Sequence, residues 1–117
     1  MKRKRMVIAV IAVLLVSLFS NHTTQAAPPR LKLTFNGTTA NCYAEVRGSA
    51  YIEVTMELWV RNTEITSWSA SGNGVVILNR EATVLTGETY TLKLKGTIGG
   101  AAFQELSVSR TNWEMNK

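Results

Sequence analysis

The stretch YIEVTMELWVR, residues 51–61, alternates apolar and polar side chains along its length. Apolar residues occupy the even positions from Ile52 to Val60, and mostly polar residues occupy the odd positions. Successive side chains of a β-strand point to opposite faces, so this period of two predicts a strand with one buried and one solvated face. Such a strand is typical of an antiparallel sheet, which can leave one face in water.

The same alternation occurs in six other segments after residue 30. The expected strands cover residues 31–35, 40–46, 51–61, 64–71, 75–85, 89–95 and 103–109. Turn-forming residues separate several of them, as at Asn36-Gly37, Gly48-Ser49, Ser71–Gly74 and Gly99-Gly100. No long stretch has the three- and four-residue apolar spacing of a helix. The sequence therefore predicts an all-β fold, an immunoglobulin-like or fibronectin-like seven-stranded β-sandwich, with a small barrel as the alternative.

The segment LTGETYTL, residues 85–92, places Tyr90 at the start of the sixth expected strand. In immunoglobulin-like sandwiches a tyrosine at this corner bonds back to upstream backbone. We expect Tyr90 to do the same, and the alternative is an ordinary core aromatic.

The single cysteine, Cys42, lies at an inward position of the second expected strand. In immunoglobulin domains the cysteine that pairs with this strand lies two residues after the corner tyrosine, and here that place is Leu92. We therefore expect Cys42 to be a buried free thiol that ionises poorly. A disulfide between two copies of the chain and a reactive thiol are the alternatives.

The N-terminus has the layout of a secretory signal peptide, with four basic residues before an apolar run and a polar segment after it. The run from Met6 to Phe19 has 14 residues, whereas a membrane-spanning helix needs about 20. A retained membrane anchor is therefore the weaker interpretation. We expect residues 1–26 to be the signal peptide and residues 27–117 to form one β-sandwich domain, secreted to the extracellular space or the cell surface.

Removal of that signal changes the charge of the protein. The formal net charge of +5 includes four leader residues, so the mature chain has nine Lys and Arg against eight Glu, about +1. Surfaces that follow nucleic-acid phosphates need clustered positive charge. Only Lys93 and Lys95 share one face of one expected strand, so the sequence argues against a nucleic-acid partner.

The chain lacks most of the residue types that catalysis and metal binding need. The chain has no aspartate, and its one histidine, His22, lies in the leader. Activated serine or cysteine nucleophiles need a base, usually histidine, and zinc sites draw on Cys and His. Glu53 and Glu57 share a strand face, but four residues separate them by about 13 Å, beyond the roughly 5–9.5 Å of glycosidase pairs. We expect no enzyme activity, no cofactor and no metal site.

Binding is the function class that these exclusions leave. Tyr43, Tyr51 and Trp59 lie at outward positions, and Trp113 lies in the polar C-terminal segment. Exposed aromatic rings can stack on sugars or contact a protein partner, so these four are candidate ligand-stacking residues. The alternative is that Tyr51 and Trp59 cover cross-strand neighbours on their own sheet.

Three segments carry a resemblance to a known family. FNGTTANCYAEV, SWSASGNG and ETYTLKLKGTIGG resemble a family of small secreted all-β proteins of unknown function from Gram-positive bacteria. The resemblance spans most of residues 31–110 and implies a signal peptide followed by one all-β domain. Members often have a second cysteine near the C-terminus, which this chain lacks, so no disulfide is carried over from the family and this departure supports a free thiol at Cys42. It implies no activity and no site residue.

The sequence thus predicts an exported, non-catalytic binding or surface-interaction module. The expected ligand is a cell-wall polysaccharide or a protein, and the domain is expected to be a monomer without a stable membrane anchor. The competing function is a small secreted effector, an antibacterial or signalling protein. Mature charge near zero argues against membrane attack, which relies on basic amphipathic surfaces.

Overall fold

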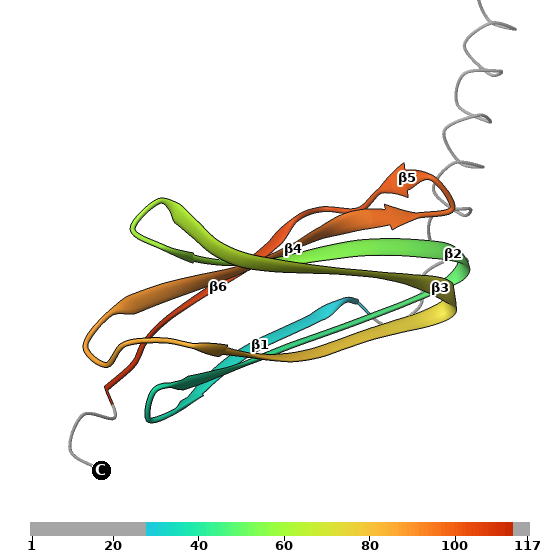
Figure 1. The fold of residues 1–117 in the computed structure, drawn as a ribbon. Helices are drawn as coiled ribbons and strands as arrows, with labels where there is room; N and C mark the ends of the chain where they lie inside the picture. Colours follow the sequence, from blue (N-terminus) through green and yellow to red (C-terminus); the bar gives the residue numbers. More distant parts are fainter. Residues whose placement is uncertain (1–27, 114–117) are drawn as a thin grey trace, which may run out of the picture.

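The computed structural model describes residues 28–113, and the expected signal peptide, residues 1–26, lies outside them. Within the described residues the protein is all-β and contains six strands (Figure 1). The strands are β1 (Arg30–Asn36), β2 (Thr39–Val60), β3 (Thr63–Thr83), β4 (Thr89–Ile98), β5 (Ala101–Ala102) and β6 (Leu106–Thr111). No helix in this part of the chain is long and apolar enough to cross a membrane.

All pairings between the strands are antiparallel and form one sheet. The central strand is β2, which pairs with β1 through its first half, with β4 through its second half and with β3 along nearly its whole length. On its other side β4 pairs with β6 and, at its end, with β5. In Figure 1 the long β2–β3 ribbon runs from one end of the domain to the other, and β1 lies below β4 and β6.

The expected division into seven strands was wrong, because two long strands replace four short ones. Strand β2 continues through Gly48-Ser49, and β3 continues through the segment Ser71–Gly74 where a turn was expected. The β2–β3 register shifts between Arg47 and Tyr51, where β2 has more residues than β3 opposite it. Gly74 takes a φ of 85°, a left-handed conformation that glycine adopts without a Cβ clash. The glycines therefore mark an irregularity within paired strands instead of their ends.

The predicted inward faces are confirmed. Even positions of β2 are buried on both sides of the irregularity, and so are Tyr90, Leu92 and Leu94 of β4. The buried side chains of the sheet form one core, whose largest fully buried apolar side chains are Leu33, Cys42, Val46, Ile52, Met56, Leu58, Leu78, Leu92 and Leu94. Across the open side of the sheet, Arg110 Nη1 of β6 donates to the carbonyl oxygen of Leu33 at 3.4 Å.

Cys42 is a fully buried free thiol, as the sequence predicted. Burial raises the pKa of its thiol to about 11, because removal from water penalises the thiolate. A side chain with no exposed surface cannot reach a cysteine of a second copy without a local opening of the sheet.

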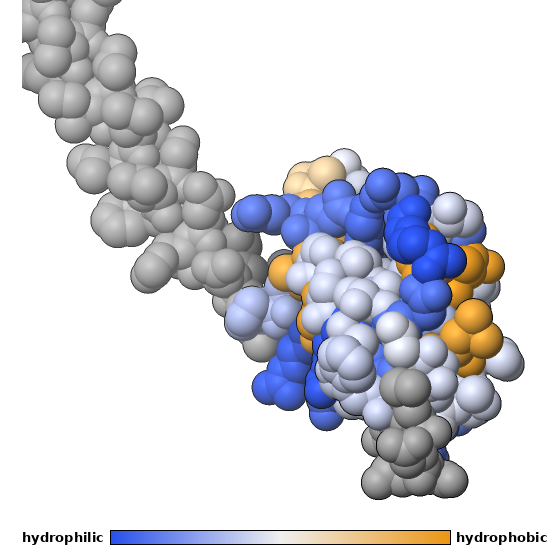
Figure 2. Space-filling view, turned by 90° about the vertical axis from the view of Figure 1, so that its left-hand side faces the viewer, coloured by the Kyte–Doolittle hydropathy of each residue, from blue (hydrophilic) through white to orange (hydrophobic). Residues whose placement is uncertain are grey.

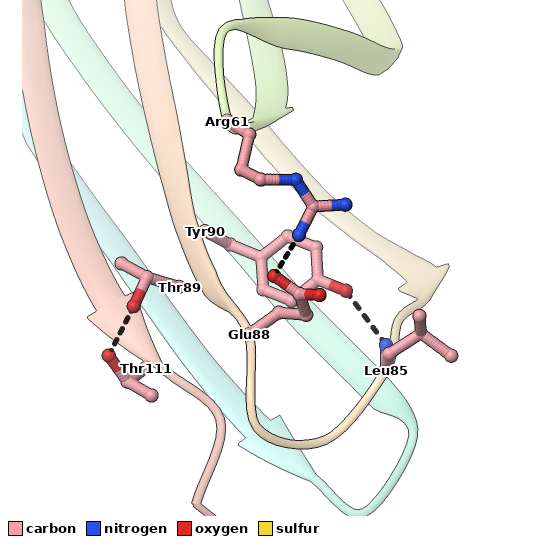
Figure 3. Close-up of polar contacts among 6 residues, drawn as sticks. All are labelled: Arg61, Leu85, Glu88, Thr89, Tyr90 and Thr111. Carbon is pink, nitrogen blue, oxygen red and sulfur yellow. Dashed lines mark hydrogen bonds and ion pairs between the residues drawn. The ribbon is translucent and has the colours of Figure 1, made fainter.

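The expected bond between Tyr90 and upstream backbone is also confirmed (Figure 3). The backbone N–H of Leu85 donates to the Tyr90 hydroxyl at 2.8 Å, while the Tyr90 ring packs against Phe35 at 5.8 Å between centroids. Tyr90 thus makes the expected bond to upstream backbone and is also a core aromatic. At the same end of the domain, buried Asn112 donates through Nδ2 to the carbonyls of Gly37 at 2.7 Å and Leu85 at 3.2 Å.

Candidate functional site

A groove of about 790 Å³ lies on the outer face of β2, β3 and β4. Its floor is formed where Thr55 of β2 lies between Ser69 of β3 and Lys95 of β4, which are its direct partners in the two ladders. One rim is formed by β5 and by the segment after it, which contributes Phe103 and Glu105. The groove is open to solvent and spans three strands, so it fits an extended ligand better than a small enclosed one.

Hydroxyl groups of neighbouring strands are already paired on this face. Thr55 Oγ1 and Ser69 Oγ lie 3.0 Å apart in the groove, and the Tyr51 hydroxyl donates to Ser71 Oγ at 2.9 Å at the same site. Each hydroxyl can both donate and accept. These cross-strand bonds therefore orient the groove hydroxyls while leaving each oxygen further capacity for a ligand.

The charges around the groove are of two kinds. Lys95 Nζ binds Glu57 Oε2 at 2.9 Å, and this bond lowers the pKa of the Glu57 carboxyl and raises the pKa of Lys95. Glu53 and Glu105 also line the groove and make no ion pair with any residue from 28 to 113. The groove thus offers two carboxylates with unused acceptor oxygens and one lysine that already has a partner.

Phe103 supplies the apolar part of the groove. Its backbone N–H donates to the Gly96 carbonyl at 3.1 Å, which holds the segment after β5 against β4. The Phe103 side chain is half-buried and also packs against the core. A ring exposed in part beside hydroxyls and carboxylates gives this rim an apolar surface next to polar groups.

Trp59 is less available as a stacking surface than its outward position suggested. Its Nε1 donates to Glu57 Oε1 at 3.0 Å, and Lys93 Nζ lies 4.3 Å from the ring centroid, in a cation–π contact. The ring is therefore half-buried under its own sheet neighbours. For Trp59 the alternative interpretation, cover of cross-strand neighbours, fits the structure better.

The other three aromatic candidates lie in separate places. The Tyr43 hydroxyl donates to Glu45 at 2.9 Å, and Tyr43 lines a second hollow of about 640 Å³ between β1 and β6. Tyr51 is 47% exposed beside the groove, and Trp113 is 73% exposed after the end of β6. Along β2, Tyr51 and Trp59 are eight residues apart, about 26 Å at roughly 3.3 Å per residue. The four aromatics do not form one stacking surface, and of them only Tyr51 adjoins the groove.

Sequence reasoning missed the groove. Its floor is visible in the sequence only as small hydroxyl residues at outward positions, such as Thr55, Ser69 and Ser71. Its rim could not be inferred, because Phe103 was assigned to a strand and lies instead in the connection between β5 and β6.

A search of protein-family models and of curated proteins finds nothing that matches this chain. In residues 28–113 no three side chains of the metal-ligating types Cys, His, Asp and Glu are grouped so that they could hold a metal ion.

Proposed function

We propose that this chain is an exported, non-catalytic binding module of the immunoglobulin-like sandwich type. Residues 1–26 would direct export, and the groove over β2, β3 and β4 would bind an extended polysaccharide of the bacterial cell wall. The resemblance to small secreted proteins of Gram-positive bacteria belongs to the same proposal. The observation that carries it is the groove itself, with paired hydroxyls on its floor and Phe103 on its rim.

The sandwich type is supported by two features. The Tyr90 corner has the bond that immunoglobulin-like domains use at this place. The two halves of the sheet enclose a common core, with β1 brought against β6.

A polysaccharide is favoured over a small molecule by the shape and the chemistry of the groove. The groove crosses three neighbouring strands and is open to solvent, so a chain of sugar units can extend beyond it, and each unit presents several hydroxyls. Thr55, Ser69 and Glu53 can bind those hydroxyls, since together they provide donors and acceptors. Bridging water contributes to such sites without making them weak.

Catalysis is not proposed for this groove. Glu57, the most buried carboxyl group of the face, is held ionised by Lys95 and by the Trp59 N–H. A general acid needs a raised pKa. The Glu57 carboxyl has the opposite shift.

Two matched substitutions test the groove. Thr55→Val and Thr91→Val each remove one hydroxyl from a pair with a serine on the next strand, Ser69 in the groove and Ser109 outside it. The protein is mixed with isolated Gram-positive cell walls, and the fraction that sediments with them is measured. We expect retention of the wild type and of Thr91→Val, and a loss of about three- to tenfold in affinity for Thr55→Val, the effect of one or two hydrogen bonds.

The outcomes separate the proposed module from its alternatives. Equal losses for Thr55→Val and Thr91→Val, or no retention of the wild type, would contradict binding in the groove. Loss of retention on Trp59→Ala or Trp113→Ala, with no effect of Thr55→Val, would place the ligand on the aromatics predicted from the sequence. Growth inhibition by the protein without retention on the walls would favour the secreted effector.

A further inference from the structure

Strand β3 has hydrogen-bonded neighbours on one side only. Among the described residues it pairs with β2 and with no other strand along its 21 residues. The segment from Ile65 to Asn79 contains no charged residue and no proline. Natural edge strands are usually protected against pairing by lysine, proline, short length, a bulge or cover. This edge lacks the first three of these protections over 15 residues, and its irregularity lies at Gly74, before Val75.

Apolar side chains are exposed on the second half of that edge. Val75 is 40% exposed and Ile77 is 51% exposed. Both lie on the outer face, because the alternate residues Val76 and Leu78 are buried. Seen end-on in Figure 2, hydrophobic groups also lie on the flanks of an otherwise polar to neutral surface. An edge without a second strand partner and with exposed apolar side chains is suited to the addition of another strand. At the far end of this segment the Asn79 carbonyl accepts from Arg80 Nη1 at 3.2 Å.

The charges beside this edge favour a partner without net charge. In the sheet, Val75 and Ile77 lie directly beside Arg47 and Glu45 of β2, which bind each other in an ion pair. The described residues contain eight basic and seven acidic side chains, so two copies of the domain repel each other little. A strongly charged partner gains nothing from an uncharged edge, whereas an identical edge meets no like charge.

We propose that the protein forms a two-fold symmetric dimer in which the second half of β3 pairs antiparallel with the same segment of a second copy. Centred on Val76, this pairing places Val75 of each copy opposite Ile77 of the other. The two outer faces then share an apolar cluster of four side chains, flanked by the Arg47–Glu45 pairs. The symmetry makes the interface self-complementary, because each edge is paired with an identical edge.

Association is tested by sedimentation velocity from micromolar to millimolar concentration. The full chain is expressed in a host with a general secretion pathway, and the purified product is measured as wild type, Ile77→Lys and Leu85→Lys. Leu85 is the matched control, because its side chain is more exposed, at 64%, but lies after the end of β3. We expect a dimer for the wild type and for Leu85→Lys, and association weakened about tenfold or more for Ile77→Lys.

A second variant and a second measurement keep the test valid if one variant fails to fold. Val75→Lys is expected to act like Ile77→Lys, and circular dichroism checks that each variant is folded. In the dimer, backbone amides between Val75 and Asn79 should exchange with deuterium more slowly as concentration rises. A wild type that stays monomeric, as the sequence predicted, would overturn the proposal, and so would equal behaviour of the Ile77→Lys and Leu85→Lys variants.

Discussion

Replacing Tyr90 with phenylalanine tests whether the corner stabilises the fold or is only an aromatic in the core. The substitution removes one oxygen and keeps the ring, so the packing against Phe35 is retained. The lost hydroxyl accepts the N–H of Leu85 at 2.8 Å in a partly buried place. A net hydrogen bond contributes about 0.5–1.5 kcal/mol, and a donor left unsatisfied in a buried place costs about 1–3 kcal/mol.

We therefore expect Tyr90→Phe to lower the free energy of unfolding by about 1–3 kcal/mol, out of the roughly 5–10 kcal/mol typical of such a domain. For a domain of this size each kcal/mol lowers the melting temperature by about 4–8 °C. Urea unfolding followed by tryptophan fluorescence measures the change.

Tyr43→Phe is the matched control. It also removes a tyrosine hydroxyl, but from a bond to Glu45 on the outer face, so we expect a loss below about 0.5 kcal/mol. A Tyr90→Phe loss no greater than that of Tyr43→Phe would refute the corner as a source of stability. In that case Tyr90 would contribute only through its ring.

Three further predictions concern the core, the backbone packing and the pH dependence. Because burial raises the pKa of Cys42 to about 11, a thiol reagent at neutral pH should label the folded protein far more slowly than the urea-unfolded protein. A Cβ on Gly96 would clash with the backbone oxygen of Glu53 in β2, so Gly96→Ala should destabilise by more than about 3 kcal/mol. Gly72→Ala, which meets nothing closer than 3.6 Å, should be folded, and equal melting temperatures for the two would contradict this argument. The pKa of Glu57 is lowered chiefly by its bond to Lys95, so the stability it contributes is present above its unfolded pKa, about 4.3, and is lost as pH falls through the lower folded value. As the pH is lowered into the acid range, the free energy of unfolding should therefore fall less steeply for Glu57→Gln than for the wild type. Parallel curves of unfolding free energy against pH would argue against this source of stability.

The alternation of side chains was sufficient to predict which residues face the core. Even positions of β2 are buried on both sides of the irregularity near Gly48, and the burial of Cys42 follows from the same parity. The alternation can be recognised within one strand, because one face of that strand is buried and the other is solvated along its whole length. It does not depend on which strands are neighbours.

Strand ends were harder to predict because glycine occurs both in the turns that end strands and in irregularities within them. Asn73-Gly74 is a strong hairpin signal in sequence, yet in the structure Asn73 pairs with Tyr51 and the strand continues. What decides between a turn and an irregularity is whether the partner strand also continues. Gly48 shows the same dependence, because a Cβ there would lie 2.8 Å from the Ile98 side chain, on a strand far away in sequence.

The candidate site could not be predicted because register brings its parts together. Trp59 was assigned correctly to the outer face, but Lys93 lies over its ring only because β4 pairs with β2 in the observed register. The groove depends in the same way on where Phe103 returns to β4 after a two-residue strand. Side-chain type indicated a polar face, and only the pairing of strands showed where that face is hollow.

The irregularity at Gly74 separates the two proposed surfaces along one strand. Before it, Ser69 and Ser71 of β3 line the groove, and after it Val75 and Ile77 form the exposed edge. Pairing centred on Val76 therefore leaves the groove residues outside the dimer interface. Two grooves held in one dimer raise the effective concentration of the second site for a polymeric ligand, which increases avidity without any new contact. Ile77→Lys should then weaken retention on intact cell walls while leaving the affinity for a short soluble fragment unchanged. A loss of affinity for the fragment as well would mean that the groove and the edge are not separate.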